Sequence, residues 1–319
     1  MYCAHFGFAR EAFGVSPDSS FYFASSQHAE ASASLYYAVS QRRGFAVLIG
    51  APGLGKTSVL VQLAEDIAAE ARVAFFVHPE FEGGAVLQSV LLAMGLEPEP
   101  DAVRSHRQLH AFLLDLQRAG KTCVVIFDEA QHLDAKSLET IRMLSNFETP
   151  RQKLIQFVLA GQPALAELLR LPECEQILQR INIVAHLEPL GPVQVEQYIA
   201  HRVAQAGAVR NPFLSEAVRA IAAASKGVPR NINTLCFNAL NLAFADGKAH
   251  VDAACVAEVV RDRMVLESAA AVTGSMPESF ALSDVGVRPS FLQAGRPFFL
   301  AAAFMLITLV CVGAAFVSH

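Results

Sequence analysis

Residues 45–57 read FAVLIGAPGLGKT and contain the clearest structural signal in the chain. FAVLIG is an apolar run of strand formers, and residues 58–70 (SVLVQLAEDIAAE) bring apolar side chains back at helical spacing. The pattern G-x-x-x-x-G-K-[ST] is matched in full by Gly50, Ala51, Pro52, Gly53, Leu54, Gly55, Lys56 and Thr57. A strand, a glycine-rich loop and a helix in this order predict a phosphate loop.

The chemistry of phosphate binding explains these residue types. Small residues let successive backbone N–H groups converge on an anion at the positive end of a helix. Lys56 adds a charge for the β and γ phosphates, and the Thr57 hydroxyl is placed to bind Mg²⁺. We therefore expect Gly50 through Ser58 to bind ATP, the alternative being a glycine-rich turn that binds nothing.

A second motif, VVIFDE, covers residues 124–129 and consists of four apolar strand residues followed by two carboxylates. In a parallel sheet, ligands bind at the carboxyl ends of the strands, so this pair is expected beside the phosphate loop. Asp128 would hold Mg²⁺, while Glu129 would orient and deprotonate the attacking water. The alternative for Glu129 is a mere helix-start acid.

Strand and helix patterns alternate through the first half of the chain. Further apolar runs cover residues 73–77, 123–127, 154–160 and 181–185, with helical segments such as 85–94 and 109–118 between them. Continuous apolar strands alternating with helices predict an α/β fold whose parallel sheet is covered on both faces. After Pro189 only helical patterns follow, at about 192–206, 213–224, 230–245 and 252–267. These predict a small all-helical lid domain.

The expected organisation has four parts. Residues 1–190 form the nucleotide-binding α/β domain, 191–268 the helical lid and 269–296 a linker, whose residues lose periodicity and gather Gly, Ser and Pro. Residues 297–317 carry no charge and are long enough to cross about 30 Å of hydrocarbon. We expect a single transmembrane helix there, with a buried C-terminal helix as the alternative. The expected location is the inner membrane, single-pass, with the ATPase domain in the cytoplasm.

Composition narrows the classes of partner. The net charge of -5 gives no overall electrostatic attraction to nucleic acid, so we do not expect a nucleic-acid partner. Mean hydropathy is +0.35, and the apolar excess gathers at the C-terminus. The six cysteines form no CxxC pair, which argues against a metal site or a disulfide framework and favours a reducing compartment. The opening MYCAHFGF lacks the basic and apolar regions of a signal peptide.

Several further runs resemble one family of ATPases. These are the opening segment HFGFAREAFGVSPDSSFYFASSQHAEASASLYYAV, in which Ala12 stands where a proline is usual, and then FDEAQHLD, LSNFET, LAGQPALAELL, QRI and GVPRNIN. Together with the phosphate loop they are similar to the AAA+ superfamily, and most of all to its ExeA-like members (general secretion pathway protein A). The resemblance covers roughly residues 1–265. It implies a homo-oligomer with a partner in secretion or envelope assembly, here lacking the periplasmic peptidoglycan-binding domain.

The resemblance also implies roles for three more residues. Gln162 is similar to a sensor of the γ-phosphate, with a turn residue capping Pro163 as the alternative. Arg180 resembles an arginine finger that reaches a neighbouring subunit, against a surface arginine or local salt bridge. Arg230 resembles a second sensor that reports phosphate occupancy to the lid, against a structural helix-start arginine.

The opening segment carries two further expectations. His28 falls where the family's first helix approaches the base, although a cap or packing residue is the more common role of such a histidine. Five aromatic side chains are expected to pack against the ATPase domain: Phe6, Phe8, Phe13, Phe21 and Phe23.

The expected function is therefore Mg²⁺-dependent ATP hydrolysis by a membrane-anchored, oligomeric motor or switch that serves a secretion or envelope-assembly system. Two alternatives stay open. One is a DNA-associated ATPase of the transposition-helper type, which would need a basic surface stripe. The other is a nucleotide-gated scaffold for export, which would turn over slowly.

Overall fold

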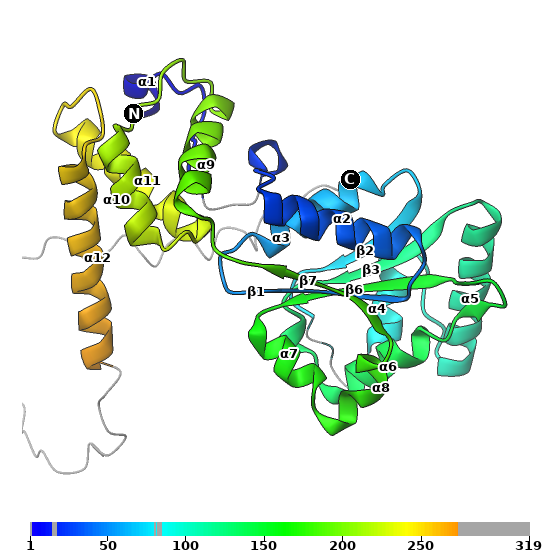
Figure 1. The fold of residues 1–319 in the computed structure, drawn as a ribbon. Helices are drawn as coiled ribbons and strands as arrows, with labels where there is room; N and C mark the ends of the chain where they lie inside the picture. Colours follow the sequence, from blue (N-terminus) through cyan, green and yellow to red (C-terminus); the bar gives the residue numbers. More distant parts are fainter. Residues whose placement is uncertain (1, 15–17, 80, 82–84, 274–319) are drawn as a thin grey trace, which may run out of the picture. The chain divides into compact units, whose positions relative to one another are not determined.

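The computed structural model describes residues 2–14, 18–79, 81 and 85–273, and for 265–273 it describes the backbone alone. Residues Met1–Ser268 form one compact unit (Figure 1). The strands are β1 Phe45–Gly50, β2 Ala71–Phe76, β3 Thr122–Phe127, β4 Glu148–Thr149, β5 Gln152–Lys153, β6 Ile155–Gly161 and β7 Ile181–Leu187. The helices before β7 are α1 Tyr2–Phe6, α2 Ser26–Ser40, α3 Lys56–Asp66, α4 Val86–Ala93, α5 Ala102–Arg118, α6 Ala135–Leu144, α7 Pro163–Leu169 and α8 Glu175–Leu178. After β7 come α9 Pro192–Gln205, α10 Ser215–Ser225, α11 Pro229–Ala245 and α12 Ala253–Thr273.

Five parallel strands form the central sheet in the order β2-β3-β6-β1-β7. The three inner strands β1, β3 and β6 are buried along their whole length, which is why their sequences read as continuous apolar runs. Since β6 lies between β1 and β3, its carboxyl end lies between the end of the phosphate-loop strand and the end of the acidic strand. The predicted parallel α/β sheet is confirmed.

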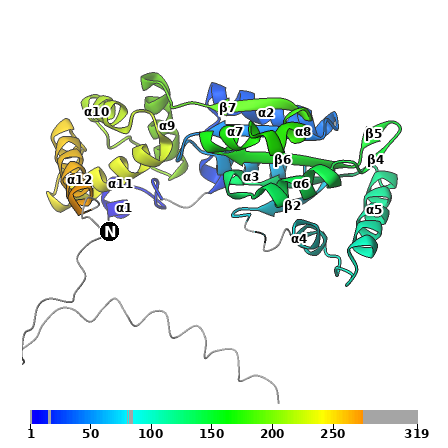
Figure 2. The same cartoon turned by 90° about the horizontal axis from the view of Figure 1, so that it is seen from below.

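Alternate residues of the inner strands pack on opposite faces of the sheet. Leu48 and Ile126 belong to a core shared with α2 and α3, whereas Val47 and Val125 face a core built with α4 to α8. In Figure 1, α2 and α3 lie above the strands and α6 to α8 below them, and Figure 2 views the same sheet from below. Burial on both faces fixes the strand ends, and the loops that follow them, in place.

Local signals set where several helices begin. The Asp101 and Asp134 side chains cap α5 and α6 by accepting backbone N–H groups of their first turns, and α9 and α11 each begin with a proline. Helix α5 begins at Ala102, seven residues before the predicted helical segment, because this capping signal outweighs the weak apolar pattern of its first turns. Helix α6 and the short β4-β5 hairpin were not predicted.

The N-terminal aromatic residues correct one expectation. Phe8, Phe13 and Phe21 belong to the core of helices α9 to α12, with Phe6 and Phe23 packed against it, rather than to the cores of the sheet. The backbone supports this placement, since Ala9 N donates to Ala206 O at 2.8 Å. The opening segment thus contributes side chains to the apolar core of these helices. The domain boundary at residue 190 stays a prediction.

The expected inner-membrane location is corrected by the structure. Among the described residues no helix combines the length and the apolar character needed to cross a bilayer. The segment 297–317, on which that expectation rested, lies outside the described residues, as does most of the expected linker 269–296.

Candidate nucleotide site

The phosphate loop joins β1 to α3 through two glycines in the left-handed region. Gly53 has φ 79° and Gly55 has φ 92°, conformations that other residues adopt only with strain. Gly55 is the residue before the first turn of α3, so the loop turns directly into the helix N-terminus. Ala51 and Pro52 are exposed, whereas the Leu54 side chain is buried in the core beneath the loop. Leu54 can therefore offer a ligand only its backbone.

Lys56 is 4% exposed and is the first residue of α3. Its ammonium donates to Gly50 O at 3.0 Å and to Ala51 O at 3.4 Å. Burial lowers the pKa of Lys56, the nearby carboxylates of Glu129 and Asp128 oppose that change, and Arg230 adds to it. In this structure the ammonium bonds the loop's own carbonyls, and it gains more from an anion held in the loop than from these neutral acceptors.

Thr57 and Asp128 meet across the site. The Thr57 hydroxyl donates to Asp128 Oδ2, and Glu129 N donates to Asp128 Oδ1 at 2.9 Å. Asp128 is 1% exposed, and burial raises the pKa of its carboxyl against the effect of these two donors. A hydroxyl and a carboxylate in contact are the hard oxygen ligands that Mg²⁺ prefers, so these residues fit the predicted ion.

Glu129 follows β3 with its backbone in the left-handed region, at φ 51°. Its Oε2 accepts two side-chain amides, from Gln131 Nε2 at 2.5 Å and from Gln162 Nε2 at 3.0 Å. Burial acts to raise the pKa of Glu129, but these two donors and Lys56 hold it below its usual value. The carboxylate is thereby kept ionised, as a proton acceptor must be.

Gln162 comes to Glu129 from the end of β6. It precedes the first turn of α7, yet its side chain makes no capping hydrogen bond and turns to Glu129 instead. The Gln162 side chain therefore does not cap α7, and its role as a sensor of the γ-phosphate stays a prediction. Gln131 completes the group, since its Oε1 accepts the backbone N–H of Gln162 at 3.1 Å. The sequence analysis missed Gln131, although it lies in the FDEAQHLD run.

Arg230 brings α11 to the phosphate loop. Its backbone N–H donates to Gly53 O at 3.2 Å, and its side chain crosses so close to Gly53 that a Cβ there would lie 2.8 Å from Arg230 Cβ. A pocket extends from the phosphate loop to helices α9 and α11. Among the residues predicted for the nucleotide site, those that line it are His28, Gly53, Gly55, Lys56, Thr57, Ser58, Glu129 and Arg230.

The far end of this pocket is aromatic and carries one buried cation that was not predicted. Arg202 on α9 is 8% exposed and forms no ion pair among the described residues. It donates to Ala12 O at 2.7 Å and to Tyr198 Oη at 2.9 Å, and its guanidinium lies 4.7 Å from the ring centre of Phe21. Tyr198 in turn donates to Asn233 on α11 at 2.9 Å. Flat apolar rings are suited to the base of a nucleotide.

His28 is hydrogen-bonded to the backbone of the phosphate loop. Its Nε2 lies 2.9 Å from Leu54 O, a pure acceptor, so Nε2 carries the proton and donates. The Ser25 hydroxyl, at 2.7 Å, then donates to Nδ1. His28 is 5% exposed, and burial lowers its pKa, which keeps the ring neutral. His28 lines the pocket, yet its polar atoms bond the loop backbone and Ser25.

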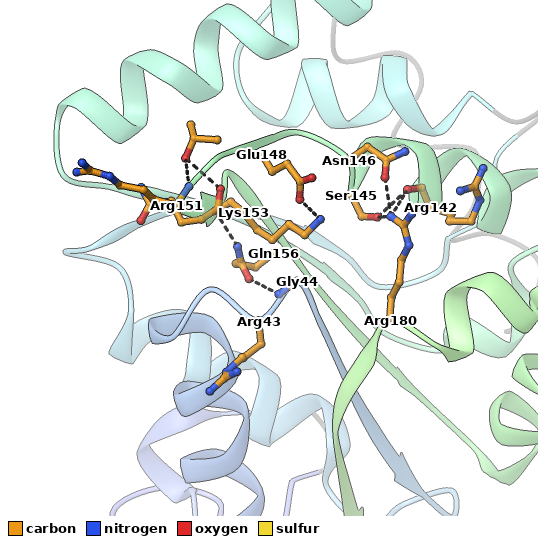
Figure 3. A network of polar contacts seen from close by, with 12 residues as sticks. Arg43, Gly44, Arg142, Ser145, Asn146, Glu148, Arg151, Lys153, Gln156 and Arg180 are labelled. Atoms are coloured by element: carbon orange, nitrogen blue, oxygen red, sulfur yellow. Dashed lines mark hydrogen bonds and ion pairs between the residues drawn. The ribbon is translucent and has the colours of Figure 1, made fainter.

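Arg180 does not join these residues and is not among those that line the pocket. Its Nη1 donates to Ser145 Oγ at 2.6 Å, to Asn146 Oδ1 at 2.7 Å and to Arg142 O at 3.4 Å (Figure 3). These groups lie at the carboxyl end of α6, where a cation complements the helix dipole. The alternative of a local salt bridge is not what the structure shows, because all three acceptors are uncharged.

Comparison with known proteins points to one superfamily. A family model described as an AAA domain matches residues 39–169. General secretion pathway protein A of Aeromonas hydrophila is 37% identical over 255 residues, which make up 77% of this chain and 46% of that protein. The chain thus spans about half the length of this relative.

Solved structures share the fold. Drosophila ORC bound to DNA matches with a TM-score of 0.61 and 17% identity, covering 85% of this chain and 68% of that one. The Holliday junction branch migration motor RuvB of Thermotoga maritima matches with a TM-score of 0.52 and 18% identity, covering 80% and 78%. At these identities the likeness establishes the architecture.

Proposed function

We propose that this chain, which belongs to the AAA+ P-loop ATPases and is related to general secretion pathway protein A, is an oligomeric switch driven by ATP. ATPase activity follows from the family and the fold. We further propose which residues carry out hydrolysis, that the helices α9 to α12 move with the nucleotide state, and that the protein acts in secretion or envelope assembly.

Binding begins with the triphosphate. The backbone N–H groups of the phosphate loop hold it at the N-terminus of α3, and Lys56 leaves its loop carbonyls to neutralise the β and γ phosphates. Thr57 and Asp128 would hold Mg²⁺, which supplies positive charge to the phosphate oxygens. The base extends toward the aromatic end of the pocket, near Phe21 and Tyr198.

Hydrolysis requires a base beside the γ-phosphate. Glu129 lines the pocket and uses one carboxylate oxygen, Oε2, to accept both amides, which leaves Oε1 to accept a proton from water. The activated water attacks the γ-phosphorus and the bond to the β-phosphate oxygen breaks, giving ADP and phosphate. Gln162 donates to Glu129 here and offers the same amide to a γ-phosphate.

The observation that carries the switch is the direct bond between Arg230 and Gly53. Because the first turn of α11 is hydrogen-bonded to the phosphate loop, a movement of the loop, or a change of charge beside it, changes the position of α11 and of the helices α9 to α12 to which it belongs. The exposed Arg230 guanidinium gains a phosphate partner with ATP and loses it after hydrolysis. The helical part therefore adopts a position that depends on the nucleotide.

Assembly and partner complete the proposal. Arg180 lies outside its own pocket, and in a homo-oligomer it would stabilise the developing charge at a neighbour's γ-phosphate. The identity to general secretion pathway protein A supports a role in secretion or envelope assembly. ADP, ATP and the empty state would then present different surfaces to a protein partner of that system.

The direct test compares purified parent protein with Glu129→Gln, in phosphate release and in binding of a fluorescent ATP analogue with Mg²⁺. We expect Glu129→Gln to keep affinity within about twofold while its turnover falls at least about a hundredfold, because only the base is removed. Turnover at the parent rate in Glu129→Gln would exclude Glu129 as the base. Lys56→Ala, which loses binding, marks the background.

A further inference from the structure

Three side-chain and backbone groups close a ring between the ends of two neighbouring strands. Gln131 Nε2 donates to Glu129 Oε2, Gln162 Nε2 donates to the same oxygen, and Gln162 N donates to Gln131 Oε1. Each glutamine is thus bonded both to the carboxylate and to the other glutamine. Gln131 is the member that uses both ends of its amide, so it fixes Glu129 relative to β6.

The backbone is shaped to deliver Gln131 to this position. Glu129 adopts φ 51°, a strained conformation for a residue other than glycine, and the turn η3 Ala130–His132 follows at once. Ala130 is fully buried and anchors that turn in the core. The strain is offset by core burial, and its consequence is that the Gln131 side chain reaches across to the end of β6.

The Gln131 amide lies directly against the backbone at the end of β6, where residue 161 is a glycine. A Cβ added at Gly161 would lie 2.7 Å from Gln131 Oε1 and 2.9 Å from Leu165 Cβ. Gly161 is the last residue of β6 and pairs with β1, so its position is fixed by the sheet. Glycine at position 161 thus leaves room for the Gln131 amide, whose orientation is set by its partners: Oε1 accepts Gln162 N–H, and Nε2 donates to Glu129.

We infer that Gln131 is a positioning residue for hydrolysis, which holds the Glu129 carboxylate so that Oε1 faces the attacking water. Both ends of the Gln131 amide are already bonded, to Glu129 Oε2 and to Gln162 N, so its role is to hold the carboxylate and not to bind the nucleotide. When a γ-phosphate draws the Gln162 amide away, Gln131 is the donor that still holds Oε2. The inference rests on the proposed role of Glu129 as the base.

The test uses the full chain with Gln131→Met, which keeps the length of the side chain but removes both amide groups. We expect kcat to fall about ten- to a hundredfold, because a carboxylate that wanders by an ångström loses most of its alignment. The KM for ATP, the affinity for a fluorescent ATP analogue and the thermal unfolding midpoint should all stay at parent values. Gln176→Met, at an exposed glutamine of α8, is the matched control and should retain the parent kcat.

A second variant and a double-mutant cycle separate positioning from support of the fold. Gln131→Glu preserves the acceptor for Gln162 N but places a carboxylate against Glu129, so we expect a loss in kcat at least as large as in Gln131→Met. In Gln131→Met combined with Gln162→Ala the fold-losses in kcat should multiply, since with a γ-phosphate bound Gln131 restrains Oε2 while Gln162 acts on the phosphate.

The outcomes distinguish this inference from the proposed function. A Gln131→Met protein with kcat at or above the parent value overturns the positioning role while Glu129→Gln remains inactive. Equal losses in kcat and in nucleotide affinity also overturn it, because they indicate a disturbed pocket. If Glu129→Gln itself hydrolyses ATP at the parent rate, the failure lies in the proposed function.

Discussion

The backbone N–H of Arg230 donates to the carbonyl of Gly53 at 3.2 Å, which bonds the first turn of α11 to the middle of the phosphate loop. This contact joins the residues that hold phosphate to the helices that would move. Whatever displaces the loop on nucleotide binding must also displace, or break from, the start of α11.

Lys56→Ala should lower nucleotide affinity at least about tenfold. The substitution removes a buried ammonium group whose two hydrogen bonds here go to neutral carbonyls and which would pair with the phosphates of ATP. Titration with a fluorescent ATP analogue in the presence of Mg²⁺ measures the change. Lys226→Ala, at an exposed lysine outside the pocket, is the control and should bind as the parent does. Parent affinity in Lys56→Ala would contradict the assigned role.

Gly53→Ala should be destabilised and should also lose nucleotide affinity. The added Cβ would lie 2.8 Å from Arg230 Cβ and 3.1 Å from Val228 Cγ1, and φ 79° is itself strained for alanine by roughly 1–2 kcal/mol. Gly247→Ala, with φ 67° and no atom within 4 Å of the added Cβ, isolates the cost of the backbone strain. Thermal unfolding and ATP titration of both variants provide the comparison. If the two behave alike, contact between α11 and the loop is unimportant.

His28 should make the stability of the fold fall at acid pH. Its pKa is lowered in the folded protein by burial, so the unfolded chain takes up a proton first as pH drops through about 6.5. The contribution is complete above that value and is lost as pH falls toward the folded-state pKa. His28→Gln removes the imidazole and should lessen the difference between unfolding midpoints at pH 7.5 and pH 5.5. The same substitution at His201, whose pKa burial also lowers, measures how much of the difference arises elsewhere.

Arg180 should act between subunits. Turnover per subunit is expected to rise with protein concentration, and mixing Arg180→Ala with Lys56→Ala should restore part of the activity, because one subunit offers an intact site and the other an intact arginine. Arg170→Ala, at an exposed arginine after α7, should not change turnover. A demonstrated monomer whose turnover is independent of concentration would remove this role and leave Arg180 as a cap for α6.

The class of the sheet and the phosphate loop could both be predicted from local sequence patterns. Gly50 through Thr57 is a contiguous motif whose conformation depends on its own glycines and on the strand and helix that flank it. The apolar runs of β1, β3 and β6 predicted buried parallel strands because both faces of such strands must be apolar. Asp128 and Glu129 were placed by the same logic, since they end one of these runs.

The groups that surround Glu129 and the surface on which the first aromatic residues pack could not be predicted from local patterns, because both depend on the folded arrangement of distant segments. Gln131 and Gln162 are separated by 31 residues, and they meet because β6 lies next to β3 in the sheet, a neighbour relation that no local pattern encodes. Phe8 and Phe13 were expected on the ATPase domain, but they pack on the helical bundle, because apolar periodicity shows that a side chain is buried without naming the surface that buries it. Which distant segments come into contact depends on how much apolar surface each possible arrangement of the whole chain buries. That comparison involves all the segments at once and cannot be made from one segment alone.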